Sequence, residues 1–358
     1  MEEIDYKKIV NETLKKMGKV NILIAGKTGV GKSTLLNTVF GCDLAKTGVG
    51  KPVTQDMKEY TKDGSYYHLY DTKGFELANY QEMAANIKQV ISAKRTSDPS
   101  EHIHIAWYCI NAHSNRYEAE ELEFIKSLSD EIPVVLVCTQ CVGENASNFY
   151  NKLKAELFNT KIHLINVLAL AWKVDDDYTK PPFGVNELID RTYELLPEAA
   201  KGAFAAAQKV NKEVTKKKVT AVIAAAATAA TAAGATPIPF SDAIVLAPIQ
   251  IGMIANISAV YGLNLDSGFL STLVASAAGV GGAIMGGRAI VAGLLKLIPG
   301  AGSVIGGTIA AATAGTLTTA MGWAYYKALT YLDDNEMEMT PETISKQFKN
   351  TLSHSNSI

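Results

Sequence analysis

The residues with the clearest chemical potential form a glycine-rich segment, GKTGVGKST, at positions 26–34. It fits the phosphate-binding-loop (P-loop) pattern G-x-x-x-x-G-K-[ST], whose glycines let backbone N–H groups turn inward around phosphate oxygens. The positive end of the helix that follows strengthens this attraction. We expect Lys32 to reach the β- and γ-phosphates and Ser33 to bind Mg²⁺. The expected nucleotide-binding residues are Gly26, Lys27, Thr28, Gly29, Val30, Gly31, Lys32, Ser33 and Thr34.

A second group of candidate residues, Asp71-Thr72-Lys73-Gly74, follows the apolar run YYHLY. An acid at the end of a strand is where a P-loop protein needs its Mg²⁺-linked carboxylate. Asp71 is therefore a predicted metal-site residue, and the N–H of Gly74 is expected to sense the γ-phosphate. The alternative is an ordinary Asp-Gly turn.

A third candidate is Thr54, in the loop before the expected edge strand 57–61. Its hydroxyl would complete the Mg²⁺ shell when a γ-phosphate is present, and Thr47 competes for the same role. Lys32, Thr54 and Gly74 are thus the expected catalytic set, and Ser33, Thr54 and Asp71 the expected metal set.

Five short apolar runs alternate with helical stretches and would position these motifs. Because most runs are continuously apolar, they predict strands buried on both faces of a mainly parallel, doubly wound α/β sheet, with 57–61 as an antiparallel edge strand. A helix over 4–17 precedes the sheet. The predicted strands are 20–25, 66–70, 103–110, 133–138 and 162–167, and the clearest predicted helices are 117–129 and 185–197.

Together the three motifs resemble the Era-like branch of the translation-factor-type GTPases, over residues 20–198. The resemblance implies GTP and GDP as ligands, with Mg²⁺. It places a fourth, base-binding motif at Thr139-Gln140 and a fifth at Leu168-Ala169, whose backbone N–H would face the guanine oxygen.

The fourth motif departs from the family pattern. Gln140 replaces the usual Lys, and Val142 stands where an Asp normally pairs with the guanine edge. A lost bidentate contact weakens discrimination between bases, so the preference for GTP over ATP rests on the resemblance, with the Gln140 stem packing over the base. Cys138 and Cys141 have the spacing of a redox pair or half a zinc site, but we expect apolar filling.

Turnover is expected to be slow. Many such GTPases orient the attacking water with a Gln after the glycine of the third motif, and here Phe75 follows Gly74. A group from elsewhere would then be needed. Arg116 is one candidate, although a surface Arg before a helix is the simpler interpretation.

Composition narrows the remaining functions. The chain has 358 residues and 47% hydrophobic residues, which excludes a wholly disordered protein. Its net charge of −2 gives no electrostatic signal for nucleic acid. Four cysteines suit a reducing compartment, and the acidic start MEEIDYKK resembles no leader, so a cytoplasmic location is expected.

The second half of the chain differs from the first. Residues 219–326 contain four charged residues, and ten of the fifteen residues 221–235 are alanine. The composition change at 216–218 predicts a domain boundary. The predicted division is a GTPase domain with its N-terminal helix at 1–197, a linker helix at 198–218, an apolar all-α domain at 219–330 and a polar tail with a short helix at 331–358.

Two hypotheses fit this apolar domain: membrane hairpins that leave both termini cytosolic, or a tightly packed bundle or shielded interface. Charge depletion favours the membrane. Gln250, Asn256 and Ser258 favour the bundle. The pairs Gly282/Gly286 and Gly302/Gly306 allow close helix approach in either case.

The run at 236–265 resembles a domain of unknown function found behind Era-like GTPases, and the pairing with helices is also similar to the immunity-related GTPases. Three functions are consistent with this: a slow GTPase switch whose helical domain docks on a membrane or partner, a nucleotide-binding pseudo-GTPase, and a membrane-active effector triggered by nucleotide. Expected partners are a guanine nucleotide, a membrane or protein bound through 219–326, and a second copy bound through the GTPase domain.

Overall fold

The computed structural model divides the chain into two compact units. Residues Gly18–Val214 form the first, here named the sheet unit, and Met1–Met17 with Thr215–Ile358 form the second, named the helical unit. The residues described are 6–41, 51–54, 57–61, 66–72, 80–114, 116–234, 242–263, 265–266, 268–270, 272–273 and 307–354. Predictions for Thr47, Gly74, Phe75 and the two glycine pairs lie outside them.

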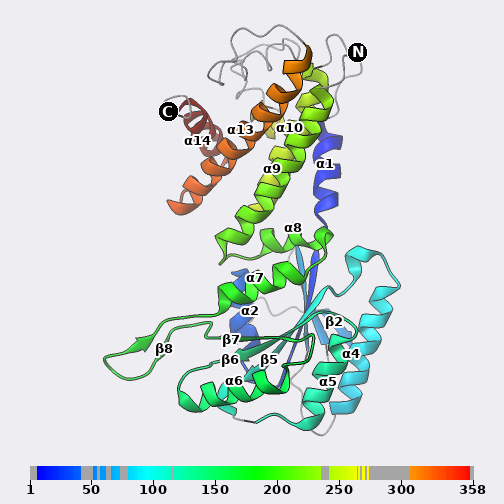
Figure 1. Ribbon diagram of the computed structural model, residues 1–358, viewed down its shortest axis with the longest axis vertical. Helices are drawn as coiled ribbons and strands as arrows, with labels where there is room; N and C mark the ends of the chain where they lie inside the picture. Colours follow the sequence, from blue (N-terminus) through cyan, green and yellow to red (C-terminus); the bar gives the residue numbers. More distant parts are fainter. Residues whose placement is uncertain are drawn as a thin grey trace. The chain divides into compact units, whose positions relative to one another are not determined.

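The sheet unit contains a seven-stranded sheet in the order β2-β3-β4-β1-β5-β6-β7 (Figure 1). The pairs of β1 with β4 and β5, of β5 with β6 and of β6 with β7 are parallel, whereas β3 pairs antiparallel with both β2 and β4. The edge on that side is therefore β2 and not, as predicted, the strand at 57–61. The mainly parallel pairing confirms the predicted fold class. The strands are β1 Val20–Ala25, β2 Lys51–Thr54, β3 Met57–Tyr60, β4 Tyr67–Thr72, β5 Ile105–Asn111, β6 Val134–Thr139 and β7 His163–Val167.

Helices cover both faces of this sheet. Apolar residues of α4 (Tyr80–Arg95), α5 (Ala119–Ser129) and α6 (Glu144–Glu156) form one buried cluster with the strands. On the other face Phe40 of α2 (Lys32–Phe40) stacks on Trp107, whose indole N–H donates to Thr192 of α7 (Val185–Leu195). Phe204 of α8 (Glu198–Ala207) completes this aromatic group. These two apolar cores hold in place the strands whose carboxyl ends carry the motifs.

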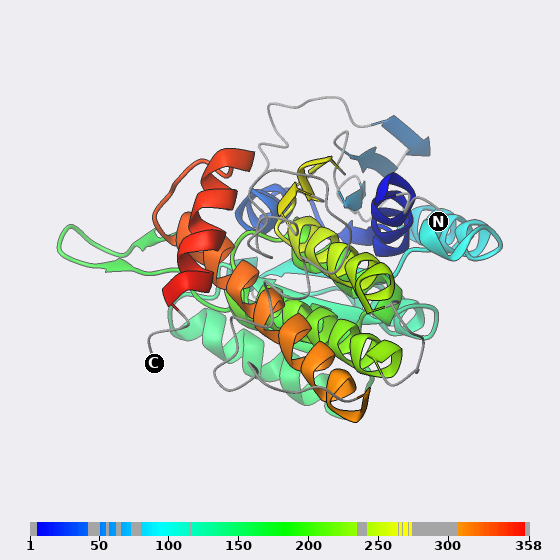
Figure 2. The same ribbon diagram turned by 90° about the horizontal axis from the view of Figure 1, so that it is seen from above.

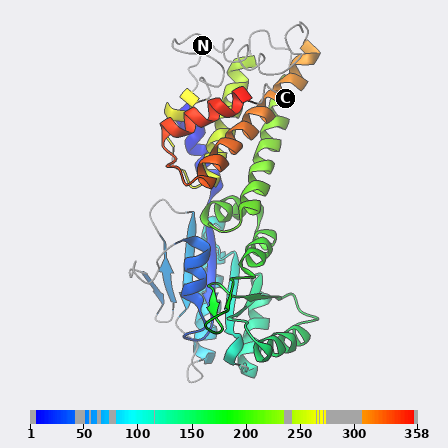
Figure 3. The same ribbon diagram turned by 90° about the vertical axis from the view of Figure 1, so that its left-hand side faces the viewer.

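The helical unit consists, in its described part, of α1 Tyr6–Met17, α9 Lys212–Gly234, α10 Asp242–Val260, α13 Gly307–Asp334 and α14 Pro341–His354 (Figure 3). Polar side chains of α10 are satisfied within the unit: Ser258 hydrogen-bonds the Tyr325 hydroxyl at 2.8 Å, and Gln250 donates to Thr318 at 3.4 Å. Tyr325 in turn packs edge-on against Phe348 of α14. In the part of the chain that the structure describes, no helix is long and apolar enough to cross a bilayer.

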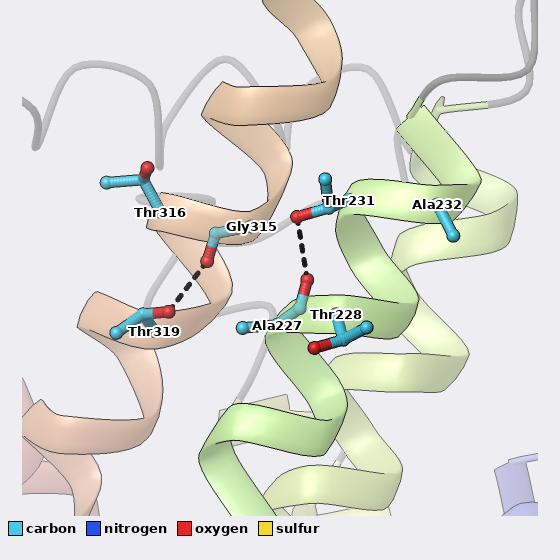
Figure 4. A pocket seen from close by; sticks show the side chains of 7 residues that line it. All are labelled: Ala227, Thr228, Thr231, Ala232, Gly315, Thr316 and Thr319. Carbon is cyan, nitrogen blue, oxygen red and sulfur yellow. Dashed lines mark hydrogen bonds between the residues drawn. The ribbon is translucent and has the colours of Figure 1, made fainter.

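Helices α9 and α13 approach closely because both carry small residues. A Cβ at Gly315 would overlap the Thr231 hydroxyl, so glycine is required at this contact. Beside it lies an open groove of about 650 Å³ (Figure 4), and Figure 2 shows α13 running beside α9 and α10. The hydroxyls of Thr228, Thr231 and Thr319 donate to carbonyls of their own helices, which leaves their methyl groups to line the groove. This surface suits helix packing rather than a charged ligand.

Two predicted boundaries need correction. The linker 198–218 is not one helix, because α8 ends at Ala207 and α9 begins at Lys212. The Gln208 side chain accepts from the N–H groups of Val210 and Asn211 and stabilises the turn between them. The N-terminal helix belongs to the helical unit, where Ile9 and Thr13 of α1 lie against Gly252 of α10. In the polar tail, α14 begins at Pro341.

Candidate nucleotide site

Strand register brings the sequence motifs to one edge of the sheet. Ile24, near the end of β1, pairs with Asp71 on β4, and the P-loop starts two residues later. Asn111 at the end of β5 pairs with Thr139 on β6, which pairs with Val167 on β7. Because parallel strands share a carboxyl edge, the first, third, fourth and fifth motifs all begin there.

The P-loop backbone depends on its glycines. Gly26, Gly29 and Gly31 have φ of 133°, 79° and 94°, values that L side chains rarely adopt. A Cβ at Gly26 would also overlap the carbonyl oxygen of Cys109 on β5. Gly31 caps the N-terminus of α2, so the loop leads directly into the positive end of that helix.

The Lys32 side chain is hydrogen-bonded to the first two residues of this loop. Its Nζ donates to the carbonyl oxygens of Gly26 at 2.8 Å and Lys27 at 3.1 Å. Burial lowers the pKa of Lys32, while the nearby Asp71 opposes that shift. A half-buried ammonium held by carbonyl oxygens is suited to an incoming phosphate. Ser33 and Thr34 are exposed beside it, as expected for groups that meet a ligand.

Asp71 lies at the same edge with unmet bonding capacity. Among the residues that the structure describes, its buried Oδ1 has no hydrogen-bond partner, and neither does the neighbouring Thr72 hydroxyl. Burial raises the pKa of the Asp71 carboxyl, and Lys32 and Lys58 oppose the rise. An orphaned carboxylate oxygen near a phosphate-binding lysine fits a Mg²⁺ ion with its water shell, because Mg²⁺ takes oxygen ligands and retains water.

Thr54 reaches this edge on a strand that the sequence analysis treated as a loop. Thr54 ends β2 and pairs with Met57 of β3, which pairs with Thr72 of β4. The register therefore places Thr54 level with the end of β4, one residue beyond Asp71. Gly74, the third expected catalytic residue, lies outside the described residues.

A side chain of the fourth motif forms a hydrogen bond with the P-loop. The hydroxyl of Thr139, a buried residue, donates to the carbonyl oxygen of Val30 at 2.6 Å, so this side chain joins β6 to the phosphate loop. Gln140 adopts φ of 54°, and its side-chain oxygen accepts from Asn111 at 3.2 Å. Asn111 is a partner that the sequence analysis did not identify. Thr139 therefore has a structural contact, and Gln140 remains the proposed base contact.

The fifth motif requires a correction at Leu168. The N–H of Leu168 donates to the carbonyl oxygen of Phe183 at 3.0 Å, and the N–H of Phe183 donates back. This bridge closes a hairpin formed by β8 Trp172–Lys173 and β9 Thr179–Lys180, which the sequence did not predict. The Leu168 N–H is therefore already used, which leaves Ala169 as the proposed contact to the base.

A contact outside the motifs also reaches the P-loop. The Lys27 ammonium lies 3.0 Å from a carboxylate oxygen of Glu121 on α5, whose side chain is 3% exposed. The Tyr108 hydroxyl donates to the other oxygen of Glu121 at 3.0 Å. Glu121 could not be singled out from the sequence, because an acid among several others at the start of a helix resembles part of a solvated face.

The two cysteines of the C-x-x-C spacing are buried. Cys138 and Cys141 belong to the buried apolar cluster of the sheet unit, as expected for filling residues. Among the described residues, no group of three or more His, Cys, Asp or Glu side chains is placed to hold a metal ion alone. Mg²⁺ at this edge would therefore share its ligands with the nucleotide. Arg116 is exposed ahead of α5.

Comparison with known proteins agrees with this geometry. Residues 21–140 match the family described as 50S ribosome-binding GTPase, and residues 199–356 match a domain of unknown function, DUF697. The chain carries a P-loop GTPase domain followed by a DUF697 domain. The match to DUF697 begins at α8, which the structure includes in the sheet unit.

Curated relatives match part of the chain. Mouse Septin-14 is 24% identical over 198 residues, covering 47% of this chain and 44% of the septin. Translocase of chloroplast 90 from Arabidopsis thaliana is 36% identical over 78 residues, 21% of this chain and 10% of that protein. GTP-binding protein A of Dictyostelium discoideum is 44% identical over 57 residues, 15% of this chain and 12% of its own length. The chain thus spans less than half the length of these relatives.

Among solved structures, a probable GTP-binding protein, engB, aligns with 49% of this chain and 98% of its own, at 17% identity and a TM-score of 0.33. Apo translation elongation factor SelB from Methanococcus maripaludis aligns with 42% of this chain and 29% of its own, at 19% identity and a TM-score of 0.28.

Proposed function

We propose that the protein is a slow, Mg²⁺-dependent GTPase switch whose helical unit docks on a membrane or a partner protein. One observation carries the proposal: the P-loop, Lys32 and the partnerless carboxylate oxygen of Asp71 meet at one sheet edge. A cation and an orphaned carboxylate at the end of a glycine-rich loop are complementary to a nucleotide phosphate chain and its metal ion.

The residues have separable roles in this proposal. Lys32 leaves the Gly26 and Lys27 carbonyls to bind the β- and γ-phosphates. Ser33, Thr54 and Asp71 would hold Mg²⁺, which would supply positive charge beside the phosphates when the γ-phosphoryl group passes to water and GDP leaves. Gly74 contributes an N–H to the γ-phosphate.

Guanine is the proposed base. The support is the family match together with the GTP-binding relative from Dictyostelium. Gln140 packs its aliphatic stem over the base, and the Ala169 N–H faces the guanine oxygen. Because Val142 offers no carboxylate, we expect a smaller preference for guanine over adenine than a full base motif would give.

Docking through the helical unit is supported by its surface. The described part of α9 exposes alanine and threonine, and its groove with α13 is lined by methyl groups. GTP would order the segments around Thr54 and Gly74, and GDP would release them. A membrane or partner responds to this change only if it binds the two states with different affinity.

The docking proposal is tested by hydrogen exchange over residues 219–326 and by liposome flotation, each with GDP and with a non-hydrolysable GTP analogue. We expect exchange rates or flotation to differ between the two nucleotides. Identical results in both states would contradict the switch and leave the helical unit a passive domain.

A second candidate function is nucleotide binding without useful turnover. It is favoured by Phe75, which cannot orient a water molecule. Phosphate release measured at several protein concentrations separates the two functions. A slow rate that rises with protein concentration supports the switch, and no release at any concentration supports the second function.

A further inference from the structure

A buried carboxylate supports the P-loop from outside the nucleotide motifs. Glu121 on α5 is 2% exposed, with one oxygen 3.0 Å from the Lys27 ammonium and the other accepting from the Tyr108 hydroxyl at 3.0 Å. A carboxylate removed from water this completely requires a charged partner. The Lys27 side chain is therefore committed to Glu121.

Lys27 also contacts the phosphate-binding lysine. Its backbone carbonyl accepts a hydrogen bond from the Lys32 ammonium at 3.1 Å. One residue of the loop is thus fixed through its side chain by α5 and bonded through its backbone to Lys32. The contacts run continuously from Glu121 through Lys27 to Lys32.

We propose that Glu121 is a positioning residue that, by holding Lys27, keeps the P-loop in the shape that receives the nucleotide phosphates. This inference rests on the proposed function, because it concerns the same phosphate site. The side chain of Lys27 then acts on the loop conformation rather than on the phosphates, and only its backbone serves the nucleotide. A small shift of a preorganised loop is costly for binding.

The chain supplies two matched controls. Glu118, on the segment that leads into α5, lies 4.0 Å from the same ammonium but is 35% exposed. Solvent-exposed ion pairs contribute little, so Glu118→Gln should leave the loop unchanged. Tyr108→Phe removes the hydrogen bond from Tyr108 to Glu121 and retains the ion pair. Its melting temperature therefore shows how much this hydrogen bond contributes to stability.

The experiment measures dissociation of a fluorescent GDP analogue from the full chain by stopped flow, with melting temperatures recorded for the same variants. Glu121→Gln and Lys27→Met should each release nucleotide about tenfold faster, equivalent to about 1.4 kcal/mol. The double variant should be no faster than either single variant, because the two side chains act as a unit. Glu118→Gln and Tyr108→Phe should stay within about twofold of the wild type.

Three results would overturn the inference. One is a wild-type dissociation rate in Glu121→Gln together with a lower melting temperature, which would make the ion pair purely structural. Another is a double variant whose effect is the product of the two single effects. The third is a failure of the wild type to bind the analogue, which would remove the proposed function as well and so is distinguishable from the first two. If a single variant does not fold, the double variant, which leaves no unpaired charge, gives the same tenfold test.

Discussion

The two units of this protein place their polar groups for different purposes. In the sheet unit, polar groups gather at one edge and some remain unsatisfied, as with the Asp71 carboxylate oxygen and the Thr72 hydroxyl. In the helical unit, hydroxyls such as those of Ser258 and Thr231 bond to groups within the unit. An edge with unmet bonding capacity is prepared for a charged ligand, whereas a surface with satisfied polar groups and small side chains is prepared for close packing.

The charged groups of the sheet unit carry a desolvation cost in free energy, which the hydrogen-bonded hydroxyls of the helical unit avoid. Burial lowers the pKa of Lys32 and raises that of Asp71, so each charged form is disfavoured in the folded chain. Binding of a metal–nucleotide complex would relieve both penalties. The difference between the units therefore predicts that substitutions at the P-loop edge act chiefly on nucleotide binding, whereas those in the helical unit act chiefly on stability.

The largest expected effect is on nucleotide affinity. Lys32→Ala should weaken GTP binding at least about 100-fold, because it removes a half-buried cation that pairs with phosphate. Isothermal calorimetry with Mg²⁺ measures this. Lys58→Ala, on the exposed side of β3, is the control for simple loss of positive charge. Unchanged affinity in Lys32→Ala would mean that the P-loop is not the binding site.

The second-largest expected effect is on the stability of the helical unit. Gly315→Val should destabilise that unit by about 1–3 kcal/mol, because a side chain cannot fit against Thr231. Ala320→Val, at an exposed position of the same helix, controls for the lower helix propensity of valine. The loss of stability is measured by chemical denaturation, monitored by tryptophan fluorescence and circular dichroism. GTP affinity should change little in both variants, and a loss of affinity as large as the loss of stability would contradict the separation of roles.

A smaller effect is expected on base selectivity. Val142→Asp should increase the preference for GTP over ATP by about tenfold, because a carboxylate there can accept two hydrogen bonds from guanine. Competition against a fluorescent nucleotide gives the ratio of the affinities for GTP and ATP. Val142→Asn supplies a control of similar size without the charge. No change in the ratio would show that the base lies elsewhere.

The smallest effect is on the stability of the nucleotide-free protein. Because burial raises the pKa of Asp71, the folded state binds a proton more tightly than the unfolded state, and stability falls as pH rises through the window above the ordinary value of 3.8. Asp71→Asn should therefore be more stable than wild type at neutral pH, by about 1 kcal/mol. The advantage should disappear below pH 3.8, where both states of the wild type are protonated. Thermal unfolding across this pH range measures the effect, and lower stability of the variant at neutral pH would refute it.

The sequence predicts most of the sheet unit because its signals are local. The P-loop pattern and the continuously apolar strands specify β1, α2 and the carboxyl edge, and the fold class follows. The edge strand containing Thr54 was missed since its short run KPVT begins with a lysine and a proline. The pair of Lys27 with Glu121 was missed because their residues lie far apart in the chain and meet only through packing. In the fifth motif, the bridge from Leu168 to Phe183 depends on a hairpin whose polar, aspartate-rich sequence resembles a loop.

The central claim is that the P-loop edge of the sheet unit binds a guanine nucleotide with Mg²⁺. The most direct test is displacement of a fluorescent GDP analogue from the full chain by unlabelled GTP and ATP, with Mg²⁺ and with a chelator. We expect GTP to displace the analogue at a concentration at least about tenfold below that of ATP, and the triphosphate to bind more weakly in the chelator. Equal displacement by the two nucleotides would contradict guanine recognition, and no binding of the analogue would contradict the site itself.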